Sequence, residues 1–381
     1  MLVFLAVAIV LICGRLTAGR GDVSYFIVAG TDFVDPGKTL SPVAVQQGQG
    51  YDGQFFYKYA LDPLDFSADG HGVHTDHPAY RMQRIAYPLM AWLLSLGGMP
   101  AAVPWALVLI NMLAFLGIGF YMVRMVVHFG GSVMQGLYPL LLCGVYMSMA
   151  RDLAEVSELF FFTASLYYLL IRRYPLFCVF ATLTILSRET SIIAYIPLAG
   201  WFVLQAGRKR ISPASLVFVA IPFLVFACWK AYIYVRIPSV ADAAAGYGSL
   251  GVPFKGIVMG LKENLDLTSA KNVMQLMFWV LYLGWQVMFV IIVLRSTSFR
   301  GLLAPGGINV LKVIYLCWLL FAICFSATIY CDDWGFVRIF SLWNMVGFLL
   351  IIAERKTLGR SFTGYSAGLA ALTIIRLIIR V

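Results

Sequence analysis

Residues 102–123 read AVPWALVLINMLAFLGIGFYMV and contain no charged side chain. As a helix this stretch would rise about 33 Å, enough to cross the roughly 30 Å hydrocarbon core of a bilayer. Similar apolar runs recur through the 381 residues, of which 61% are hydrophobic and 12% charged. An ordinary soluble domain has about 25% charged residues. The sequence therefore predicts an all-α polytopic membrane protein, with residues 1–381 forming a single integral-membrane domain.

About eleven transmembrane helices are expected, at 2–19, 102–123, 132–150, 157–171, 174–187, 190–206, 213–235, 272–294, 307–327, 338–353 and 363–379. Residues 85–98 are also apolar, but a helix of this length reaches only about 21 Å. They are expected to form a re-entrant or interfacial helix. Residues 2–14 have the apolar character of a signal-peptide core. No basic residue precedes them and Arg15 follows, so an uncleaved first helix is expected.

The basic residues indicate which side of the membrane each connection faces. If residues 85–98 do not cross and the N-terminus is cytoplasmic, the Lys and Arg clusters at 172–173, 208–210 and 355–360 lie inside. Most carboxylates and the two long connections, 20–101 and 236–270, then lie outside; Arg15 and Arg20 break the pattern. The net charge of +10 is thus attributed to topology and contact with anionic lipids, not to nucleic-acid binding. A bacterial inner membrane is the expected location.

A polar segment in the first long connection reads GQGYDGQFFYKYALDP, residues 48–63. Asp52 lies beside Tyr51 and is followed by aromatic residues. A carboxylate in this setting suits a general base that removes a proton from an acceptor hydroxyl. The alternative is that Asp52 caps an interfacial helix. Gln54 and Tyr57 are candidate substrate-binding residues of the same segment.

Two arginines precede the short apolar segment, at positions 81 and 84. The charge rule disfavours basic residues on the outer side, so Arg81 and Arg84 need a reason to be there. Guanidinium groups suit bidentate binding of phosphate. The alternative is that both side chains reach towards outer lipid headgroups.

Acidic residues recur at the next expected outer connection. Asp152, Glu155 and Glu158 follow the third crossing at a spacing of three, which places them near one helical face. Such a face is suited to bind a divalent cation or to orient an acceptor. It is equally suited to cap the next helix, since acids are favoured at helix N-termini.

Two further outer connections carry charged pairs. Arg188 and Glu189 stand between two apolar runs, where they either pair with each other or extend into a shared cavity. Asp332, Asp333 and Arg338 flank Trp334 at the last outer connection. Charges at helix ends near membrane depth are costly unless they are paired or functional. Together they predict one site built from distant segments.

Other sequence features are weaker candidates for a functional site. His71, His74 and His77 supply zinc-type ligands, but they lie in a polar, Gly-containing loop that is better explained as solvated. The seven cysteines are scattered without a CxxC pair and are expected to be buried packing residues. The sequence contains no P-loop, no GxGxxG and no GxSxG motif. Energy from cytoplasmic ATP is therefore not expected.

The segment around Asp52 resembles the GT-C superfamily of integral-membrane glycosyltransferases, and in particular the GPI mannosyltransferase II-like group and its bacterial relatives. That group has Trp-Asp-x-x-x-aromatic-x-x-x-Ala in its first outer loop, followed by a segment with an aromatic residue and Pro. Here the corresponding residues are 51–57 with Ala60, then Arg84-Ile85-Ala86-Tyr87-Pro88. Tyr51 replaces the Trp of the pattern.

The resemblance implies a polyprenyl-phosphate sugar donor, an outward-facing site and an inverting transfer to a lipid or glycan acceptor. Asp52 would be the base, and Asp152 and Glu155 would match an acidic pair of the second outer loop in some members. Arginines would neutralise the leaving phosphate, with Arg81, Arg84, Arg188 and Arg338 as candidates. No metal ligand set is assigned, although a divalent cation is compatible with the acidic residues. The main rival is a lipid or polyol flippase without covalent chemistry, which broken helices and midplane charges would favour.

Overall fold

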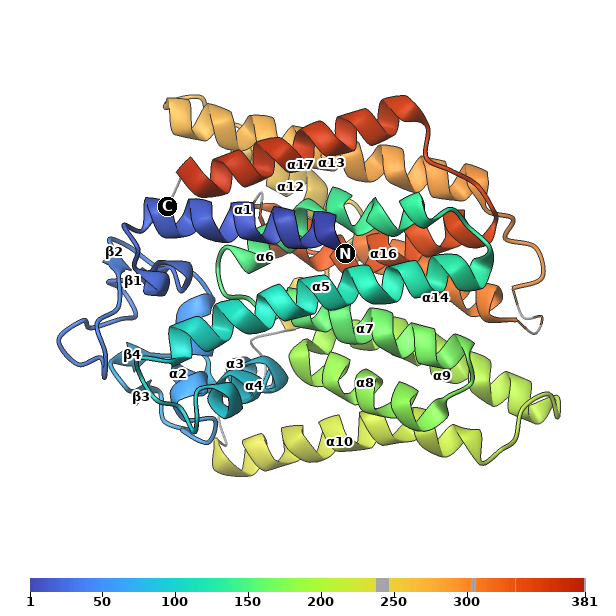
Figure 1. Ribbon diagram of the computed structural model, residues 1–381, viewed down its shortest axis with the longest axis horizontal. Coiled ribbons are helices and arrows are strands. Elements are labelled where there is room, and N and C mark those ends of the chain that lie inside the picture. The colour runs from blue at the N-terminus through green and yellow to red at the C-terminus, as the bar shows by residue number, and fades with distance from the viewer. Residues whose placement is uncertain (238–246, 303, 305, 333, 380–381) are drawn as a thin grey trace.

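The computed structural model (Figure 1) describes residues 1–237, 247–302, 304, 306–332 and 334–379 of the chain. Long helices run side by side along its length. They are α1 (Leu2–Ala18), α5 (Val103–Phe129), α7 (Glu155–Leu170), α8 (Tyr174–Ser187), α9 (Ile192–Gly207), α10 (Ser215–Arg236), α13 (Ala270–Ser296), α14 (Gly307–Cys324), α16 (Gly335–Ala353) and α17 (Arg360–Ile379).

Within the described ranges, seven of the helical segments are long and apolar enough to cross a membrane: α5, α9 together with the preceding 3-10 turn η3 (Glu189–Ser191), α10, α13, α14, α16 and α17. Helices α1 and α8 are apolar but shorter. This agrees with an all-α polytopic membrane protein, whereas the number of eleven crossings stays a prediction.

The expected span at 132–150 is not one continuous helix. Residues Val133–Leu141 form the 3-10 helix η2, and Cys143–Met149 form the short α-helix α6. Pro139 lies inside η2 and has no N–H to donate, and Leu142 between the two helices is extended. The run that hydropathy predicts as one helix is therefore interrupted at Leu142.

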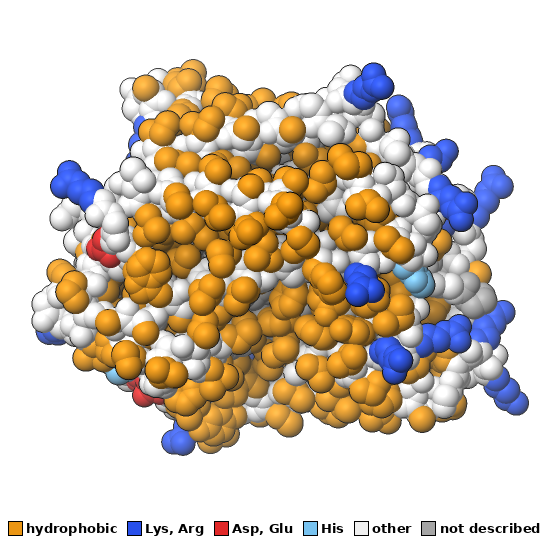
Figure 2. All heavy atoms as spheres, viewed as in Figure 1, with side chains coloured by type: hydrophobic (Ala, Val, Ile, Leu, Met, Phe, Trp, Pro, Cys, Tyr) orange, Lys and Arg blue, Asp and Glu red, His pale blue; other side chains and the backbone are white. Residues whose placement is uncertain are grey.

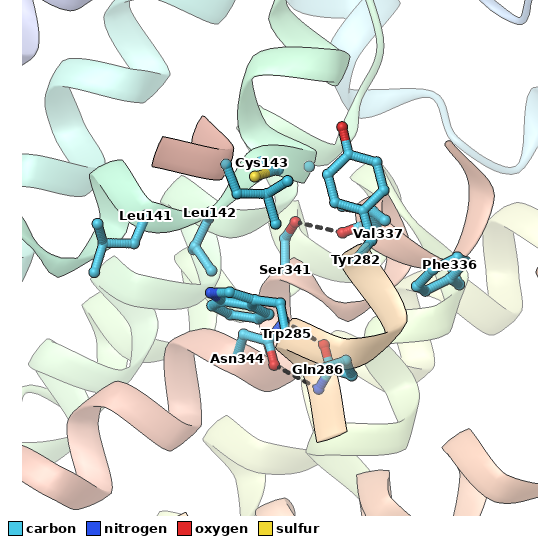
Figure 3. A pocket seen from close by; sticks show the side chains of 12 residues that line it. Leu141, Leu142, Cys143, Tyr282, Trp285, Gln286, Phe336, Val337, Ser341 and Asn344 are labelled. Atoms are coloured by element: carbon cyan, nitrogen blue, oxygen red, sulfur yellow. Dashed lines mark hydrogen bonds between the residues drawn. The ribbon is translucent and has the colours of Figure 1, made fainter. Parts of the chain in front are cut away.

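Helix α16 forms the centre of the bundle. Almost all its side chains are buried, and it contacts α5, α6, α7, α13 and α14. A cavity of only about 20 Å³ lies beside it, where Gln286 and Asn344 pair through two hydrogen bonds of 2.9 Å (Figure 3). That volume is near the minimum for a single water molecule. This cavity is therefore too small to hold a substrate.

The segment between α1 and α5 folds as a cap over one end of the helices (Figure 1, left). It contains η1 (Val23–Phe26), the parallel pair β1 (Ala29–Gly30) and β2 (Val45–Gln46), α2 (Gly53–Leu61), the antiparallel pair β3 (Asp69–Gly70) and β4 (Val73–His74), α3 (Pro78–Met82) and α4 (Ala86–Leu94). The nine residues of α4 would rise about 14 Å, too little to cross a bilayer. A short helix without a crossing was expected at this position.

A buried lysine holds the cap together. Lys58 of α2 is fully buried, and its Nζ donates to Ser67 O at 2.6 Å, Ala68 O at 3.0 Å and Thr75 Oγ1 at 3.2 Å. A buried ammonium group is tolerated only with such partners. Residues 62–77 are thereby tied to α2.

The second long connection also carries short helices. It contains η4 (Tyr247–Ser249) and α12 (Lys255–Asn264), and α12 packs against α15 (Ala327–Tyr330). Gly256 allows the close approach, since a Cβ there would lie 2.1 Å from Phe325 O. The start of α16 is therefore flanked by the cap on one side and by α12 and α15 on the other.

The surface agrees with a membrane environment. Figure 2 shows hydrophobic side chains spread across the face of the helices, and Lys and Arg gathered mainly at the end opposite the cap. Helix α10 is apolar, yet only four of its 22 residues are buried and half are exposed. Exposed apolar helices of this length are explained by contact with lipid.

Candidate functional site

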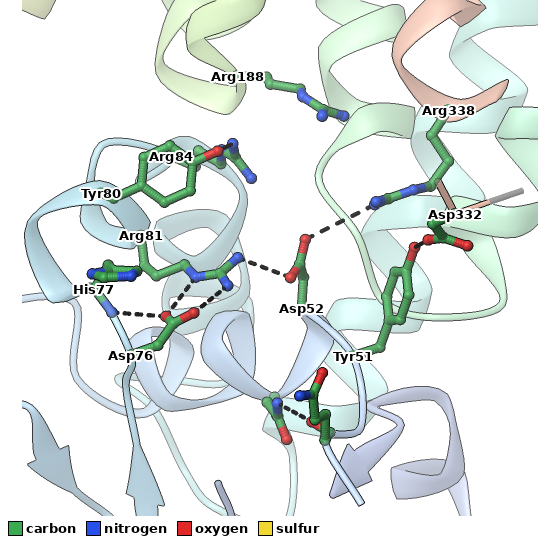
Figure 4. Close-up of polar contacts among 12 residues, drawn as sticks. Tyr51, Asp52, Asp76, His77, Tyr80, Arg81, Arg84, Arg188, Asp332 and Arg338 are labelled. Carbon is green, nitrogen blue, oxygen red and sulfur yellow. Dashed lines mark hydrogen bonds and ion pairs between the residues drawn. The ribbon is translucent and has the colours of Figure 1, made fainter. Parts of the chain in front are cut away.

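The turn before α2 places Asp52 at the centre of a cluster of charged side chains (Figure 4). Asp52 is the N-cap residue of α2, but its side chain makes no cap hydrogen bond. Its Oδ1 instead accepts from Arg81 Nη1 at 2.8 Å, and its Oδ2 lies 4.0 Å from Arg338 Nη1. The carboxylate therefore bridges the cap and α16, and helix capping does not explain its orientation.

Arg81 is fixed on both sides. Its Nε and Nη2 donate to the two carboxylate oxygens of Asp76 at 2.9 and 2.7 Å. Its guanidinium lies over the Phe55 ring, 4.3 Å from the centroid. The Arg81 side chain is 16% exposed, so it points into the site and not outward to lipid headgroups.

Glu155 at the start of α7 joins two other arginines. Arg338 Nη1 donates to Glu155 Oε1 at 2.8 Å, and Arg188 Nη1 donates to the same oxygen. All three side chains are less than 10% exposed. Arg188 Nε is buried without a hydrogen-bond partner among the described residues, which leaves one strong donor free at this point.

Arg84 and Glu189 form the next pair along the site. Arg84 Nε and Nη2 donate to Glu189 at 2.9 and 2.7 Å, a bidentate arrangement. Arg84 Nη2 also contacts Tyr80 Oη at 2.5 Å. Arg188 and Glu189 therefore do not pair with each other, and Arg188 reaches into the shared cluster instead. Adjacent residues before a helix point in different directions, which separates their side chains.

Tyr51 lies on the opposite side of Asp52 from Arg81. Its hydroxyl donates to Asp332 Oδ2 at 3.1 Å, and the guanidinium of Arg338 lies 4.9 Å from its ring centroid. Arg151 stacks between the rings of Tyr51 and Trp334, at 4.3 and 4.2 Å. The predicted site residue Asp333 falls outside the described residues.

The charges around Asp52 control its protonation. Burial alone would raise the pKa of this carboxyl, but the positive charges of Arg81, Arg338, Arg84 and Arg188 outweigh burial and hold its pKa well below the usual range. Burial acts in the opposite sense on the Arg81 guanidinium, and there the charges of Asp52 and Asp76 prevail and raise its pKa. Asp52 is thus ionised at neutral pH.

A cavity of about 700 Å³ opens next to this cluster. Its charged end is lined by Arg84, Arg188, Glu189 and Lys230, and Lys230 Nζ donates to Gln83 at 3.1 Å. Its remaining walls are mainly apolar, from α9, α10, α14 and α15: Ile192, Ile193, Ile196, Pro197, Phe226, Phe321 and Ile329. A space with a cationic end and apolar walls suits an amphiphile with an anionic head.

Three predicted residues lie outside this network. Gln54 is buried and binds Gly30 N and Gln49 O at 3.0 Å each, so it supports the turn. Tyr57 packs in the core of the cap, 3.3 Å from Ser41 Oγ. Asp152 is fully buried, neither carboxylate oxygen has a partner among the described residues, and burial raises its pKa well above the usual range.

Several residues of the site were not singled out from the sequence. Asp76 and Tyr80 orient Arg81 and Arg84, Arg151 stacks on Tyr51, and Lys230 lines the cavity. Lys230 could have been noticed in the sequence, because it is one of two cations near the end of the apolar helix α10, together with Arg236. Asp76 and Arg151 lie in loops and Tyr80 lies in the short helix α3, and their partners become evident only in the fold.

Metal ligands do not gather at this site. Among the described residues there is no group of three or more His, Cys, Asp or Glu placed to hold an ion. Glu155 is engaged by two arginines, and His74 pairs with Asp69 at 2.8 Å. The described chain therefore offers no preformed cation site in the places that the sequence suggested.

Comparison with known proteins gives no assignment. No family model matches the chain, and neither the curated proteins nor the solved structures searched contain a match. What this site does is therefore argued from its geometry alone.

Proposed function

We propose that the protein is a membrane glycosyltransferase that moves a sugar from a polyprenyl-phosphate donor to an acceptor hydroxyl on the outer face, in a bacterial inner membrane. The observation that carries the proposal is the cavity next to the charged cluster, which is lined by Arg84, Arg188, Glu189 and Lys230 and otherwise mainly by apolar side chains. A lipid phosphate matches both parts of this cavity. Asp52 lies at the centre of the adjoining charged cluster, and the reacting sugar would extend towards it from the cavity.

Donor binding rests on the arginines. Arg188 Nε is a buried donor without a partner among the described residues, and a phosphate oxygen would satisfy it. Arg84 and Lys230 line the same end of the cavity. Guanidinium groups bind phosphate oxygens in a charge-assisted manner, and they would stabilise the negative charge that develops on the leaving phosphate. The polyprenyl chain would lie along the apolar walls between α9, α10 and α14.

The transfer itself needs one base and one leaving group. The acceptor hydroxyl gives its proton to Asp52 while its oxygen attacks the anomeric carbon. The bond between that carbon and the phosphate oxygen breaks, and polyprenyl phosphate leaves with the electron pair. A single displacement of this kind inverts the anomeric centre. The ion pairs of Asp52 with Arg81 and Arg338 support this role, because they would hold the carboxylate in position for the proton transfer.

The test replaces Asp52 by Asn and follows release of polyprenyl phosphate from a labelled polyprenyl-phosphate sugar in proteoliposomes. General-base removal is expected to lower the rate about 10²–10⁴-fold. Asp35→Asn is the matched control, since Asp35 belongs to the same cap but is exposed, pairs with Lys38 at 3.1 Å and accepts from Gly37 N at 3.0 Å, away from the charged cluster. Equal rates in Asp52→Asn and the unsubstituted protein, with equal thermal stability in detergent, would remove Asp52 from the role of base.

The same assay separates transfer from transport. A flippase moves the intact donor across the bilayer and releases no polyprenyl phosphate. Movement of intact labelled lipid without a change in its headgroup would therefore favour the lipid or polyol carrier. Glu155 is the first residue of α7 and Arg338 lies in the first turn of α16, so the charged cluster lies at the ends of these helices and not midway along them, which supports transfer over a midplane carrier site.

A further inference from the structure

A second cavity lies at the other end of the helices. It has a volume of about 380 Å³ and is lined by the ends of α5, α7 and α9 and the start of α14. Glu155 at the first residue of α7 belongs to the charged cluster, and Leu169 and Leu170 at its last turn line this cavity. Sixteen helical residues separate the two by about 24 Å, close to one hydrocarbon thickness.

The lining of this cavity is cationic and has no acidic member. Arg172, Arg210 and His128 contribute the charged or titratable side chains. Neither Arg172 nor Arg210 has a carboxylate partner within the described ranges. Two guanidinium groups that converge on one space without a counter-ion favour an anionic ligand.

The cavity also contains a hydrogen-bond donor that lacks an acceptor. Trp201 lines it, and its indole Nε1 is buried without a partner in the described chain. A buried N–H without an acceptor is energetically unfavourable, so such groups are rare unless a ligand or water binds them. A phosphate or ester oxygen in the cavity would accept this N–H.

The backbone closes the cavity on a further side. Helix α14 begins here, and its N-cap Gly306 provides no side-chain cap, nor is there an acidic residue in its first turn. Gly307 packs so closely on α7 that a Cβ would lie 2.4 Å from Leu170 Cδ2. The positive end of a helix dipole thus adds to the two arginines.

The rest of the cavity lining is mainly apolar, and this distinguishes a lipid phosphate from a free phosphate. Aromatic and aliphatic side chains form the walls: Phe129, Leu169, Leu170, Tyr174, Phe202, Ile211, Ile308 and Val310. A free phosphate would leave these walls in contact with water, whereas a lipid would cover them with its acyl chains. Figure 2 shows that Lys and Arg gather at this end of the molecule, which by the charge rule faces the anionic inner leaflet.

We propose that this cavity is a specific site for one anionic glycerophospholipid of the inner leaflet, with its phosphate between Arg172, Arg210 and the Trp201 indole and its chains against α9 and α14. The site is independent of the transfer reaction and lies at the opposite end of α7 from Glu155, about 24 Å along the helix. Bound lipid would join the ends of α7 and α9 to the start of α14.

The test uses native mass spectrometry of the full chain with phosphatidylglycerol or phosphatidylcholine as the added lipid. The cavity variant is Arg172→Gln with Arg210→Gln. The matched control is Arg173→Gln with Lys209→Gln, which removes the same charge from the neighbouring positions that do not line the cavity. One phosphatidylglycerol is expected to be retained per chain, with at least tenfold weaker retention in the cavity variant and less than a twofold change in the control.

A second variant guards against misfolding of the first. Trp201→Phe keeps the charges and the aromatic wall but removes the N–H, and is expected to weaken phosphatidylglycerol retention about threefold to tenfold without affecting phosphatidylcholine. Equal weakening in the cavity and control variants would mean general charge attraction and overturn the site. Equal retention of both lipids, or full displacement of phosphatidylglycerol by inorganic phosphate, would also overturn it.

Discussion

Replacing Glu155 by Gln tests whether two buried arginines depend on one carboxylate. Arg188 and Arg338 both donate to Glu155 Oε1, and the three side chains are 6%, 9% and 6% exposed. Glu155→Gln keeps the shape of the side chain and one oxygen acceptor. It removes the negative charge that both guanidinium groups share, so the substitution leaves two buried cations with weaker compensation.

The expected cost follows from that burial. Removing one partner of a buried ion pair destabilises a protein by about 3–5 kcal/mol. Because the Gln amide oxygen still accepts a hydrogen bond, and Arg338 retains Asp52 at 4.0 Å, we expect the lower value, about 3 kcal/mol. With an unfolding entropy of about 2 cal/mol/K per residue, this loss lowers the melting temperature of a chain of this size by about 4 °C.

The assay is thermal unfolding in detergent followed by tryptophan fluorescence. Glu158→Gln is the matched control, since Glu158 is also buried in α7, one turn further on, and forms no ion pair among the described residues. Its replacement is expected to leave the melting temperature unchanged or raise it. If Glu155→Gln melts no earlier than Glu158→Gln, the charge of Glu155 does not hold the two arginines.

Three further predictions address the cap and its base. Gly53→Ala should displace α2 and lower the rate of sugar transfer, because a Cβ there would lie 2.4 Å from Arg151 O. Gly200 has open space around it, so the control variant Gly200→Ala should melt at or above the temperature of the unsubstituted protein. Lys58→Met removes three hydrogen bonds and should make residues 62–77 the first site of limited proteolysis. Because folding lowers the pKa of Asp52, the ionised carboxylate stabilises the folded protein. This stabilisation is complete above about pH 3.9, the pKa of Asp in the unfolded chain, and is lost only as the pH falls below that value. Asp52 should therefore cause no change in melting temperature between pH 8 and 5, and Arg81→Gln should move the acid limb of kcat/KM to higher pH.

Hydropathy and charge were sufficient to predict where most helices lie. The expected span 174–187 coincides with α8, and 272–294 lies within α13. The broken run at 132–150 was missed because apolar composition does not distinguish an α-helix from a 3-10 helix. Likewise the cap has short strands and turns whose geometry depends on contacts with distant residues, so the sequence indicated only a polar connection.

The site was predicted as a set of residues on one side, but not as a set of pairs. Arg84 and Glu189 are 105 positions apart, and Glu155 and Arg338 are 183 apart. Spacing within a helix cannot give such pairs, because they depend on how the helix ends meet. Spacing in the sequence also could not show that the Gln54 side chain turns away from the site towards Gly30 N. Every residue of a short amphipathic helix is an equal candidate for substrate binding until its neighbours are known.

The paired charges bear on when Asp52 can act. Among the described residues, four arginines face four carboxylates in this cluster: Arg81, Arg84, Arg188 and Arg338 against Asp52, Asp76, Glu155 and Glu189. The free site is thus close to neutral, and its arginines keep Asp52 a weak base. A donor phosphate brings negative charge next to Arg84 and Arg188 and offsets the field that they exert on Asp52, so the pKa of Asp52 rises when the donor is bound. Base strength then follows donor binding, and an acceptor hydroxyl is deprotonated only when a sugar is present to receive it.

This coupling can be read from the pH dependence of the reaction. Since kcat/KM reports the pKa of Asp52 in the free protein and kcat its pKa in the donor complex, the acid limb of kcat should lie at higher pH than that of kcat/KM. If the two acid limbs coincide, the donor phosphate does not change the pKa of Asp52 and must bind elsewhere.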